Sequence, residues 1–258
     1  MRWRDMPAAL YLLAVLVFIF LPVVVLVQFS FQDGLVPVPP FKGFSLRWYE
    51  RLLADRRLVE ALWNSTMVAA LSSLAATALG FLAAWGLARG RPRFAAPIQY
   101  LLMAPVTVSY LIIGLGLLLT FNQLGLAKSL WAVGVGHVVI NLPLAFAILY
   151  SQLGEHQASL ERAARDLGAG EMATLALITV PVLWPALLAA FLIAATLSWD
   201  EFIIAFLLTR FDVTLPVVIW SMLRSGLNPE LNAVGTLVFA ISILLVLGVE
   251  LLLLRRGR

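Results

Sequence analysis

The sequence predicts an all-α membrane protein with six transmembrane helices in a single domain, residues 1–258. Its 258 residues are 62% hydrophobic and only 12% charged, and the mean hydropathy is +0.97. Soluble domains average about 45–50% apolar and 25% charged residues, so this composition excludes a soluble fold. Six apolar stretches each reach the roughly 20 residues that a helix needs to cross a bilayer. Arginines gather at the ends of these stretches, as is typical of membrane proteins.

The six predicted spans are joined by loops of very different length. They cover residues 8–29, 62–88, 97–120, 129–152, 182–208 and 231–254. The first span follows Arg2 and Arg4 in the sequence, and an apolar run after basic residues is also typical of a signal peptide. Its apolar run is longer than a typical signal-peptide core, however, and no Ala-x-Ala cleavage site precedes Asp33. We therefore expect it to be a retained span.

Basic residues in the short turns predict the orientation of the chain. Turn 89–93 carries three arginines and no acidic residue, whereas turn 121–128 carries a single lysine. Because cytoplasmic loops are richer in Arg and Lys, both termini are expected on the inner side.

Residues 30–60 then form the longest outer segment. Residues 46–62 carry Leu46, Tyr49, Leu52 and Leu53 at helical spacing, which predicts an amphipathic helix lying on the outer interface.

The sequence lacks the residues and motifs that several kinds of chemistry require. The chain contains no cysteine, which excludes disulfides and thiolate chemistry. Neither histidine belongs to an H-E-x-x-H metal motif, and neither lysine follows the glycine that a Walker A nucleotide site requires. The net charge of +4 is small and lies at span ends, so no nucleic-acid partner is expected. The chain is expected to be no enzyme and to bind no cofactor itself.

A short charged helix is predicted in the long loop 153–181, between the fourth and fifth spans. Four of its residues lie at i, i+3, i+4 and i+7 and form a small apolar face: Leu160, Ala163, Ala164 and Leu167. Glu161, Arg162, Arg165 and Asp166 fill the other face. Gly168 stands where a left-handed helix stop favours a residue without a Cβ. Such a face suits docking into another protein, and the alternative is a helix lying on the bilayer surface.

The motif in this loop resembles the EAA loop of ATP-binding-cassette (ABC) importer permeases. It reads Glu161-Arg-Ala-Ala-Arg-Asp-Leu-Gly-Ala, followed by Pro181-Val-Leu-Trp-Pro. The family pattern has Glu directly before the two alanines, where this chain has Arg162. Three further segments are similar to polyamine (spermidine/putrescine-type) permeases: Thr196–Phe202, Leu215–Met222 and Gly226–Ala233.

This resemblance implies a type I ABC importer permease fold in the bacterial cytoplasmic (inner) membrane. It implies a coupling helix that rests in a cleft of a separate ATPase subunit, present in two copies, which binds the ATP and Mg. The residues implied for coupling to the ATPase are Leu160, Glu161, Ala163, Ala164, Leu167 and Gly168. A second permease chain, expected as a heterodimer although a homodimer stays open, and an extracytoplasmic solute-binding protein complete the implied assembly.

Two adjacent acidic residues in the fifth predicted span are candidates for the substrate path. Asp200 and Glu201 lie roughly 7–8 Å outward of the span's midpoint, and Thr196 lies one turn before Asp200. Charge at membrane depth usually faces a cavity, and Asp200 is favoured because it shares the stripe of Thr196, with Glu201 nearer the partner chain or the interface. Tyr110, in the third span, adds an aromatic face that can hold a cation. Alternatively, the helix ends early and both carboxylates reach the interface.

The substrate predicted from the resemblance is a polyamine or a similar small cationic solute. Ser109-Tyr110, however, stands where polyamine-type permeases carry a proline followed by an acidic residue. Importers of iron complexes, opines, phosphonates or thiamine share the loop and remain alternatives. A secondary transporter is the other class, but it would need an internal repeat or an intramembrane ion site, and neither is visible.

Polar and small residues in the remaining spans predict helix packing. His137 and Asn141 form an i,i+4 pair that is expected mainly to hydrogen-bond between packed helices. Gly114-Leu-Gly116 and Gly134-Val-Gly136 are expected to allow close helix approach.

Overall fold

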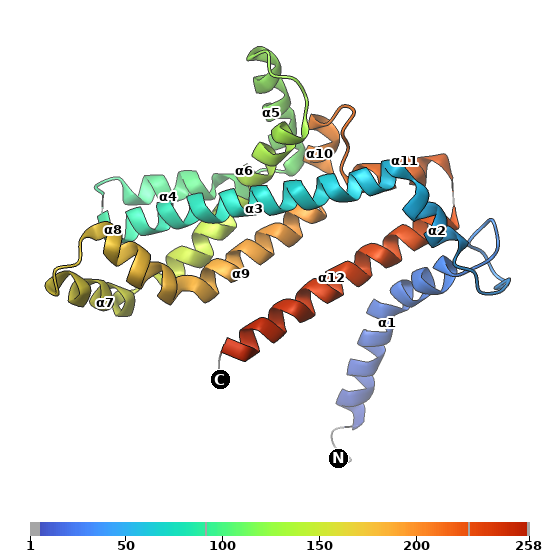
Figure 1. Ribbon diagram of the computed structural model, residues 1–258, viewed down its shortest axis with the longest axis horizontal. Coiled ribbons are helices and arrows are strands. Elements are labelled where there is room, and N and C mark those ends of the chain that lie inside the picture. Colours follow the sequence, from blue (N-terminus) through green and yellow to red (C-terminus); the bar gives the residue numbers. More distant parts are fainter. Residues whose placement is uncertain (1–5, 91, 227, 257–258) are drawn as a thin grey trace. The chain divides into compact units, whose positions relative to one another are not determined.

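The computed structural model is built of helices (Figure 1). It describes residues 6–90, 92–226 and 228–256, and the side chains of residues 9–90, 92–226 and 228–244. Most of the described residues lie in helices, and no β-strand occurs among them. The predicted all-α class is confirmed.

The chain forms two compact units, each with its own packing. One unit is Met1–Glu60 with Val218–Arg258, and the other is Ala61–Val217. The expected single permease domain stays a prediction.

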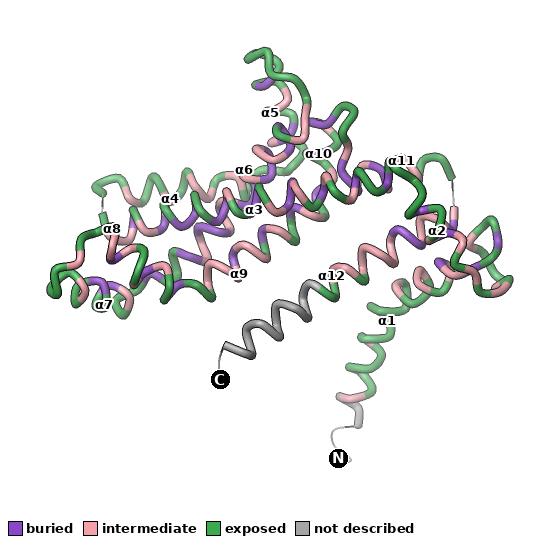
Figure 2. Tube along the Cα trace, viewed as in Figure 1, coloured by how far each residue is buried: buried purple, intermediate pink, exposed green. Residues whose placement is uncertain are grey.

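In the first unit, α1 (Met6–Ser30) lies along α12 (Pro229–Arg256). The two helices approach closely at Gly235, where an added Cβ would lie 3.1 Å from Leu26 Cδ1. Most of α1 is exposed (Figure 2), and an 18-residue window within Ala9–Ser30 has a mean hydropathy of 3.2. Such an exposed apolar surface suits contact with lipid or with another membrane chain.

The segment after α1, residues 31–54, folds around a buried tryptophan on α2 (Arg47–Ala54), and α2 packs on α12. Trp48 Nε1 donates a hydrogen bond to the backbone oxygen of Gln32 at 2.7 Å. Leu52, one turn later, is also buried, whereas Leu46 and Leu53 are exposed. The predicted stripe is therefore only partly right: Leu52 is buried and Tyr49 is half-buried, but the buried face of α2 also includes Trp48, which the prediction left out. The predicted helix also breaks at Asp55, between α2 and α3.

The second unit holds most of the remaining helices. They are the rest of α3 (Arg56–Gly90), α4 (Ala95–Met103), η2 (Ala104–Thr107), α5 (Tyr110–Gln123), α6 (Leu130–Gln152), α7 (Glu155–Asp166), α8 (Glu171–Thr174), η3 (Leu175–Thr179), α9 (Val180–Trp199) and α10 (Ile203–Leu208). α11 (Leu215–Ser225) begins in this unit and ends in the other. η3 is a π-helical turn that leads directly into α9.

Two apolar clusters form the core of the second unit. One joins α3, α6 and α9 through Phe81, Leu149 and Leu183, and the other joins α6 and α10 through Val133, Ile204 and Leu208. All these side chains are less than 9% exposed.

Among the residues that the structure describes, four helical stretches are long and apolar enough to cross a membrane: Ala9–Ser30, Arg56–Gly90, Leu130–Gln152 and Glu171–Trp199. A fifth span is possible if Ala95–Thr107 and Tyr110–Gln123, which meet at 105°, count as one. The expectation of an uninterrupted third span is wrong: Val108 is extended, and Ser109 caps α5 by accepting a hydrogen bond from the Ile112 N–H.

The fifth predicted span, 182–208, is also interrupted. Its helix α9 ends at Trp199, and a separate helix, α10, begins at Ile203. Asp200 and Glu201 therefore lie beyond the end of a helix and not inside one, as the alternative interpretation of these residues foresaw.

Glycines allow close helix approach at selected positions only. A Cβ at Gly136 would lie 2.5 Å from Ile204 Cγ2, and one at Gly114 would lie 2.7 Å from Leu207 Cδ1. An added Cβ at Gly116 or Gly134 would meet no atom within 4 Å. Only one glycine of each predicted pair therefore lies at a close helix contact. At Gly80, a Cβ would lie 2.8 Å from the backbone nitrogen of Phe146, so α3 and α6 touch there through their backbones.

Gly80→Ala is therefore expected to lower the melting temperature of the purified protein, because the backbone of α6 must shift at a cost of about 1–3 kcal/mol. The matched control is Gly86→Ala on the same helix, where an added Cβ meets no atom within 4 Å. The control is expected to keep or raise the melting temperature, since Ala is favoured over Gly in helices by about 1 kcal/mol. Equal melting temperatures for the two variants would contradict the close approach of α3 and α6.

Candidate functional site

Helix α7 ends in a Schellman motif built on Gly168. The Gly168 N–H donates to the Arg165 oxygen at 2.9 Å, and the Ala169 N–H donates to the Ala164 oxygen at 3.0 Å. Gly168 has a φ of +90°, which strains any residue that carries a Cβ. The predicted helix stop at Gly168 is confirmed.

The predicted apolar face of α7 points away from the chain. Leu160 is 37% exposed and Leu167 is 90% exposed, Ala163 is exposed and Ala164 is half-buried. We call these four residues the α7 stripe. The face that α7 turns toward the chain carries Ala158 and Glu161 instead. An apolar stripe left open at the surface suits a protein partner.

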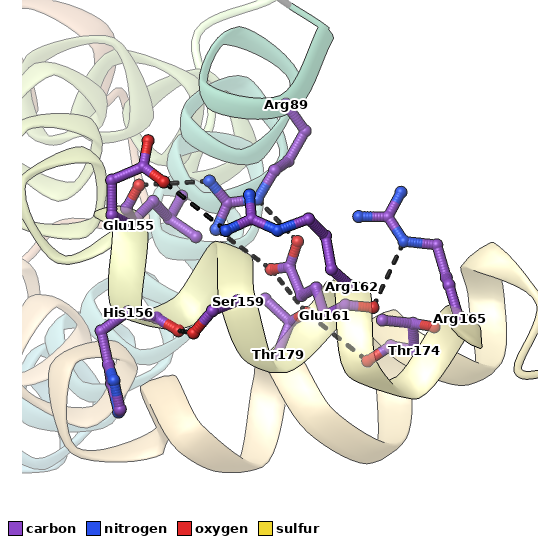
Figure 3. A network of polar contacts seen from close by, with 10 residues as sticks. Arg89, Glu155, His156, Ser159, Glu161, Arg162, Arg165, Thr174 and Thr179 are labelled. Atoms are coloured by element: carbon purple, nitrogen blue, oxygen red, sulfur yellow. Dashed lines mark hydrogen bonds and ion pairs between the residues drawn. The ribbon is translucent and has the colours of Figure 1, made fainter. Parts of the chain in front are cut away.

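Glu161 is turned inward and not toward the exposed surface. Its side chain is 3% exposed, and its carboxylate pairs with Arg89 at the end of α3 (Figure 3). Arg89 Nε lies 2.6 Å from Oε2, and Arg89 Nη2 lies 3.2 Å from Oε1. The hydroxyl of Thr179 donates a third hydrogen bond to Oε1 at 3.0 Å. Glu161 could therefore contribute to coupling only through its contacts with Arg89 and Thr179, and not by touching a partner protein directly.

The same ion pair ties several elements together. Arg89 Nη1 also donates to the backbone oxygen of Leu153, at the end of α6. The pair therefore joins the end of α3, the end of α6 and the start of α9 to α7. Beside it lies a cavity of about 280 Å³. The cavity is lined by Trp85, Gly86, Arg89, Gly90, Glu161, Arg165, Glu171, Thr174, Leu175 and Thr179.

The predicted path residues separate into two groups. Asp200 is exposed at the end of α9, and its N–H donates to the Thr196 oxygen at 3.3 Å, so the two residues share one side of the helix end as predicted. Thr196 is also exposed, and its hydroxyl bonds to the Leu192 oxygen. Tyr110 is the first residue of α5 and is 40% exposed.

Glu201, in contrast, is only 5% exposed, so it is buried within the chain and does not lie at an interface. Both of its carboxylate oxygens accept from the Ile204 N–H at 3.0 Å, and Oε2 also accepts from the Ala205 N–H at 3.2 Å. These are free amides at the start of α10, and a carboxylate there is favoured by the helix dipole. Glu201 Oε2 also lies 3.3 Å from His137 Nε2, which is a close polar contact and not an aligned hydrogen bond.

His137 extends this contact to two serines. Its Nδ1 lies 2.6 Å from Ser198 Oγ, and Ser198 Oγ lies 3.0 Å from Ser72 Oγ. The predicted interhelical hydrogen bonding of His137 is confirmed. Asn141 is fully buried, but its side-chain amide makes no hydrogen bond within the part of the chain that the structure describes.

Three residues of this site had no role predicted from the sequence: Ser72, Thr179 and Ser198. Arg89 served only to predict the orientation of the chain and not as a partner of Glu161. Arg89 closes an apolar span, and its partner Glu161 lies in a loop many residues away, so only the fold brings them together. Glu201 carried a usable sign, because an acidic residue just before a short apolar segment is typical of a helix start. Among the described residues, no group of three or more His, Cys, Asp or Glu side chains is placed to hold a metal ion.

Comparison with known proteins gives consistent matches. The family described as binding-protein-dependent transport system inner membrane component matches residues 76–256. Putrescine transport system permease protein PotI of Escherichia coli (strain K12) is 35% identical over 229 residues, which cover 86% of this chain and 81% of PotI. Spermidine/putrescine transport system permease protein PotC of the same strain is 28% identical over 244 residues, which cover 94% of this chain and 92% of PotC.

A similar fold occurs in the crystal structure of a bacterial ABC transporter involved in the import of the acidic polysaccharide alginate. One of its chains superimposes with a TM-score of 0.69 at 19% identity, with 99% of this chain and 98% of that chain covered. The family match extends over more than half of the sequence and includes α7, α9 and the residues around Asp200. The chain therefore belongs to the binding-protein-dependent transport system inner membrane components, and it is an ABC importer permease related to the polyamine permeases.

Proposed function

We propose that this chain forms the translocation path of an ATP-driven importer and couples it to a separate ATPase subunit through α7. The coupling role is supported by the difference between the two faces of α7. The α7 stripe is exposed, while Glu161 on the inward face is held by Arg89 and Thr179. A push on the stripe is then passed to α3, α6 and α9 through a buried ion pair. Such a pair resists separation, because breaking it leaves a buried charge.

We further propose a polyamine or a similar small cationic solute as the substrate. PotI and PotC, by name, transport putrescine and spermidine/putrescine. The fold alone does not choose the substrate, since the superimposed alginate transporter imports an acidic polysaccharide. Substrate selectivity therefore has to come from side chains along the path. The exposed carboxylate of Asp200 favours a cation over an anion. Import of an iron complex, opine, phosphonate or thiamine is the alternative.

The proposed assembly follows from the family. We propose two ATPase subunits that bind ATP and Mg, a second permease chain that forms a heterodimer with this one, and an extracytoplasmic solute-binding protein. In the bacterial inner membrane, α12 supplies the sixth span and the bent pair α4–α5 supplies the third, with both termini inside. The 28 residues of α12 are long enough for this role at 1.5 Å per residue.

Leu167→Asp tests the coupling role. A charge at this 90% exposed residue of the α7 stripe is expected to lower uptake and substrate-stimulated ATPase activity of the assembled complex about tenfold or more, because a key interface contact is worth about 2 kcal/mol. Met172→Asp is the control, since Met172 is an exposed apolar residue (76%) of α8 outside the α7 stripe. If both variants couple normally, or lose coupling equally, α7 is not the docking helix.

Single cysteines test the orientation, and the native chain has none to interfere. Cysteines at the exposed positions Lys42 and Asp212 are expected to react with an impermeant thiol reagent added from outside. A cysteine at Asp166, also exposed in the structure, is expected to react only after the membrane is opened. The opposite labelling pattern would place α7 on the outer side and rule out its contact with the ATPase.

Asp200→Asn tests the substrate. Near an effective dielectric constant of about 20, a carboxylate attracts an ammonium group at 4 Å by a few kcal/mol. Removing the charge is therefore expected to raise the putrescine concentration for half-maximal uptake about tenfold. Asp212→Asn changes an exposed carboxylate of the loop after α10 in the same way and is expected to have no effect. An unchanged half-maximal concentration in Asp200→Asn would remove the physical support for a cationic substrate.

A further inference from the structure

A chain of buried polar side chains crosses the second unit and ends at the start of α10. It runs from Ser72 on α3 to Ser198 on α9, then to His137 on α6 and Glu201 in the turn before α10. All four residues are between 1% and 5% exposed. Burying an imidazole and a carboxylate is costly unless they are paired and hydrogen-bonded, so their arrangement has to be held closely.

The carboxylate of Glu201 has no room for a substrate. Its oxygens already accept three backbone contacts from Ile204 and Ala205, and the imidazole of His137 covers one of them. Asp200, the neighbouring residue, is exposed. Adjacent residues near a helix end point in directions about 100° apart, which explains why one faces inward and the other outward.

Glu201 instead fixes the position of α10, and α10 fixes α5. Ile204, whose N–H bonds to Glu201, is the residue that a Cβ at Gly136 of α6 would touch, and it also lies 3.6 Å from a Cβ position at Gly114 of α5. α10 is therefore held between α5 and α6 at two glycines. Tyr110, a predicted path residue, begins the helix on which α10 packs.

We infer that His137 and Glu201 are positioning residues for transport, which hold α10 between α5 and α6 and leave Asp200 as the carboxylate that meets the substrate. This inference rests on the proposed function. Because the pair does not touch the substrate, it acts on the rate of the conformational step and not on substrate recognition. Loss of an interaction that stabilises the transition state of this step, and not the bound substrate, lowers the maximal rate and leaves the half-saturating concentration unchanged.

The first test is putrescine uptake by vesicles that contain the full complex. Glu201→Gln places an NH₂ donor against the Ile204 N–H and is expected to lower the maximal rate about tenfold or more, at an unchanged half-saturating concentration, as expected for losing hydrogen bonds to a charged group. Asp200→Asn is expected to do the reverse: it raises the half-saturating concentration and leaves the maximal rate unchanged. His137→Gln keeps a donor for Glu201 and is expected to retain more of the rate than His137→Leu. A raised half-saturating concentration in Glu201→Gln would overturn the inference.

The second test does not depend on the substrate. The pair Gly114→Cys and Leu207→Cys reports the contact of α5 with α10, because Leu207 Cδ1 lies 2.7 Å from a Cβ at 114. Glu201→Gln is expected to slow disulfide formation by this pair about tenfold, in line with a lost hydrogen bond to a charged group. The control pair, Leu26→Cys with Gly235→Cys, reports α1 against α12 and is expected to be unaffected.

The outcomes of the two tests separate the inference from the proposed function. Unchanged cross-linking of the 114–207 pair in Glu201→Gln overturns the inference, whatever the complex transports. Absent putrescine uptake by the native complex contradicts the proposed substrate, and the cross-linking comparison still decides the positioning role. If Glu201→Gln does not accumulate in membranes, cross-linking of the 114–207 pair is measured in His137→Leu instead, with His137→Gln as the conservative control.

Discussion

Among the side chains that the structure describes, two carboxylates are removed from solvent, and each is stable only because other segments supply its partners. Glu161 and Glu201 are 3% and 5% exposed. A buried carboxylate left without partners is destabilising by several kcal/mol, so the groups around it cannot separate freely. Glu161 holds α7 to the ends of α3 and α6 and the start of α9, and Glu201 holds α10 to α6. The packing of the second unit depends on these two charges being satisfied.

Each buried carboxylate also has neighbours that face outward. Glu161 lies beside Leu160 of the exposed α7 stripe, and Glu201 lies beside the exposed Asp200. In both places one residue anchors the backbone from within, and its neighbour in the sequence is exposed. An anchored neighbour keeps an exposed group in a fixed position, which is what a docking helix and a substrate path both need.

The sequence predicted well what depends on local pattern and less well what depends on tertiary contact. The helical class, the apolar stripe of α7 and the stop at Gly168 follow from periodicity and from backbone freedom at a single residue. The break at Ser109 lies in a stretch that is apolar on both sides, so hydropathy did not locate it. The break after Trp199 coincides with Asp200 and Glu201, and an early helix end there was foreseen only as an alternative. Arg89 could not be assigned to Glu161, because the contact joins residues far apart in the chain. The six-span count, the orientation and the coupling role remain predictions.

The π-helical turn η3 has a consequence for how this loop can change in evolution. A π turn contains one residue more than an α turn, and here it spans Leu175–Thr179, just before α9. Deleting one residue within it would turn the π turn into an α turn and leave the flanking helices in phase. The same deletion between α7 and α8 would remove the Gly168 stop or shorten the short link to α8. Relatives that differ by one residue in this region are therefore best aligned with the gap inside residues 175–179, where the helix tolerates a change of length.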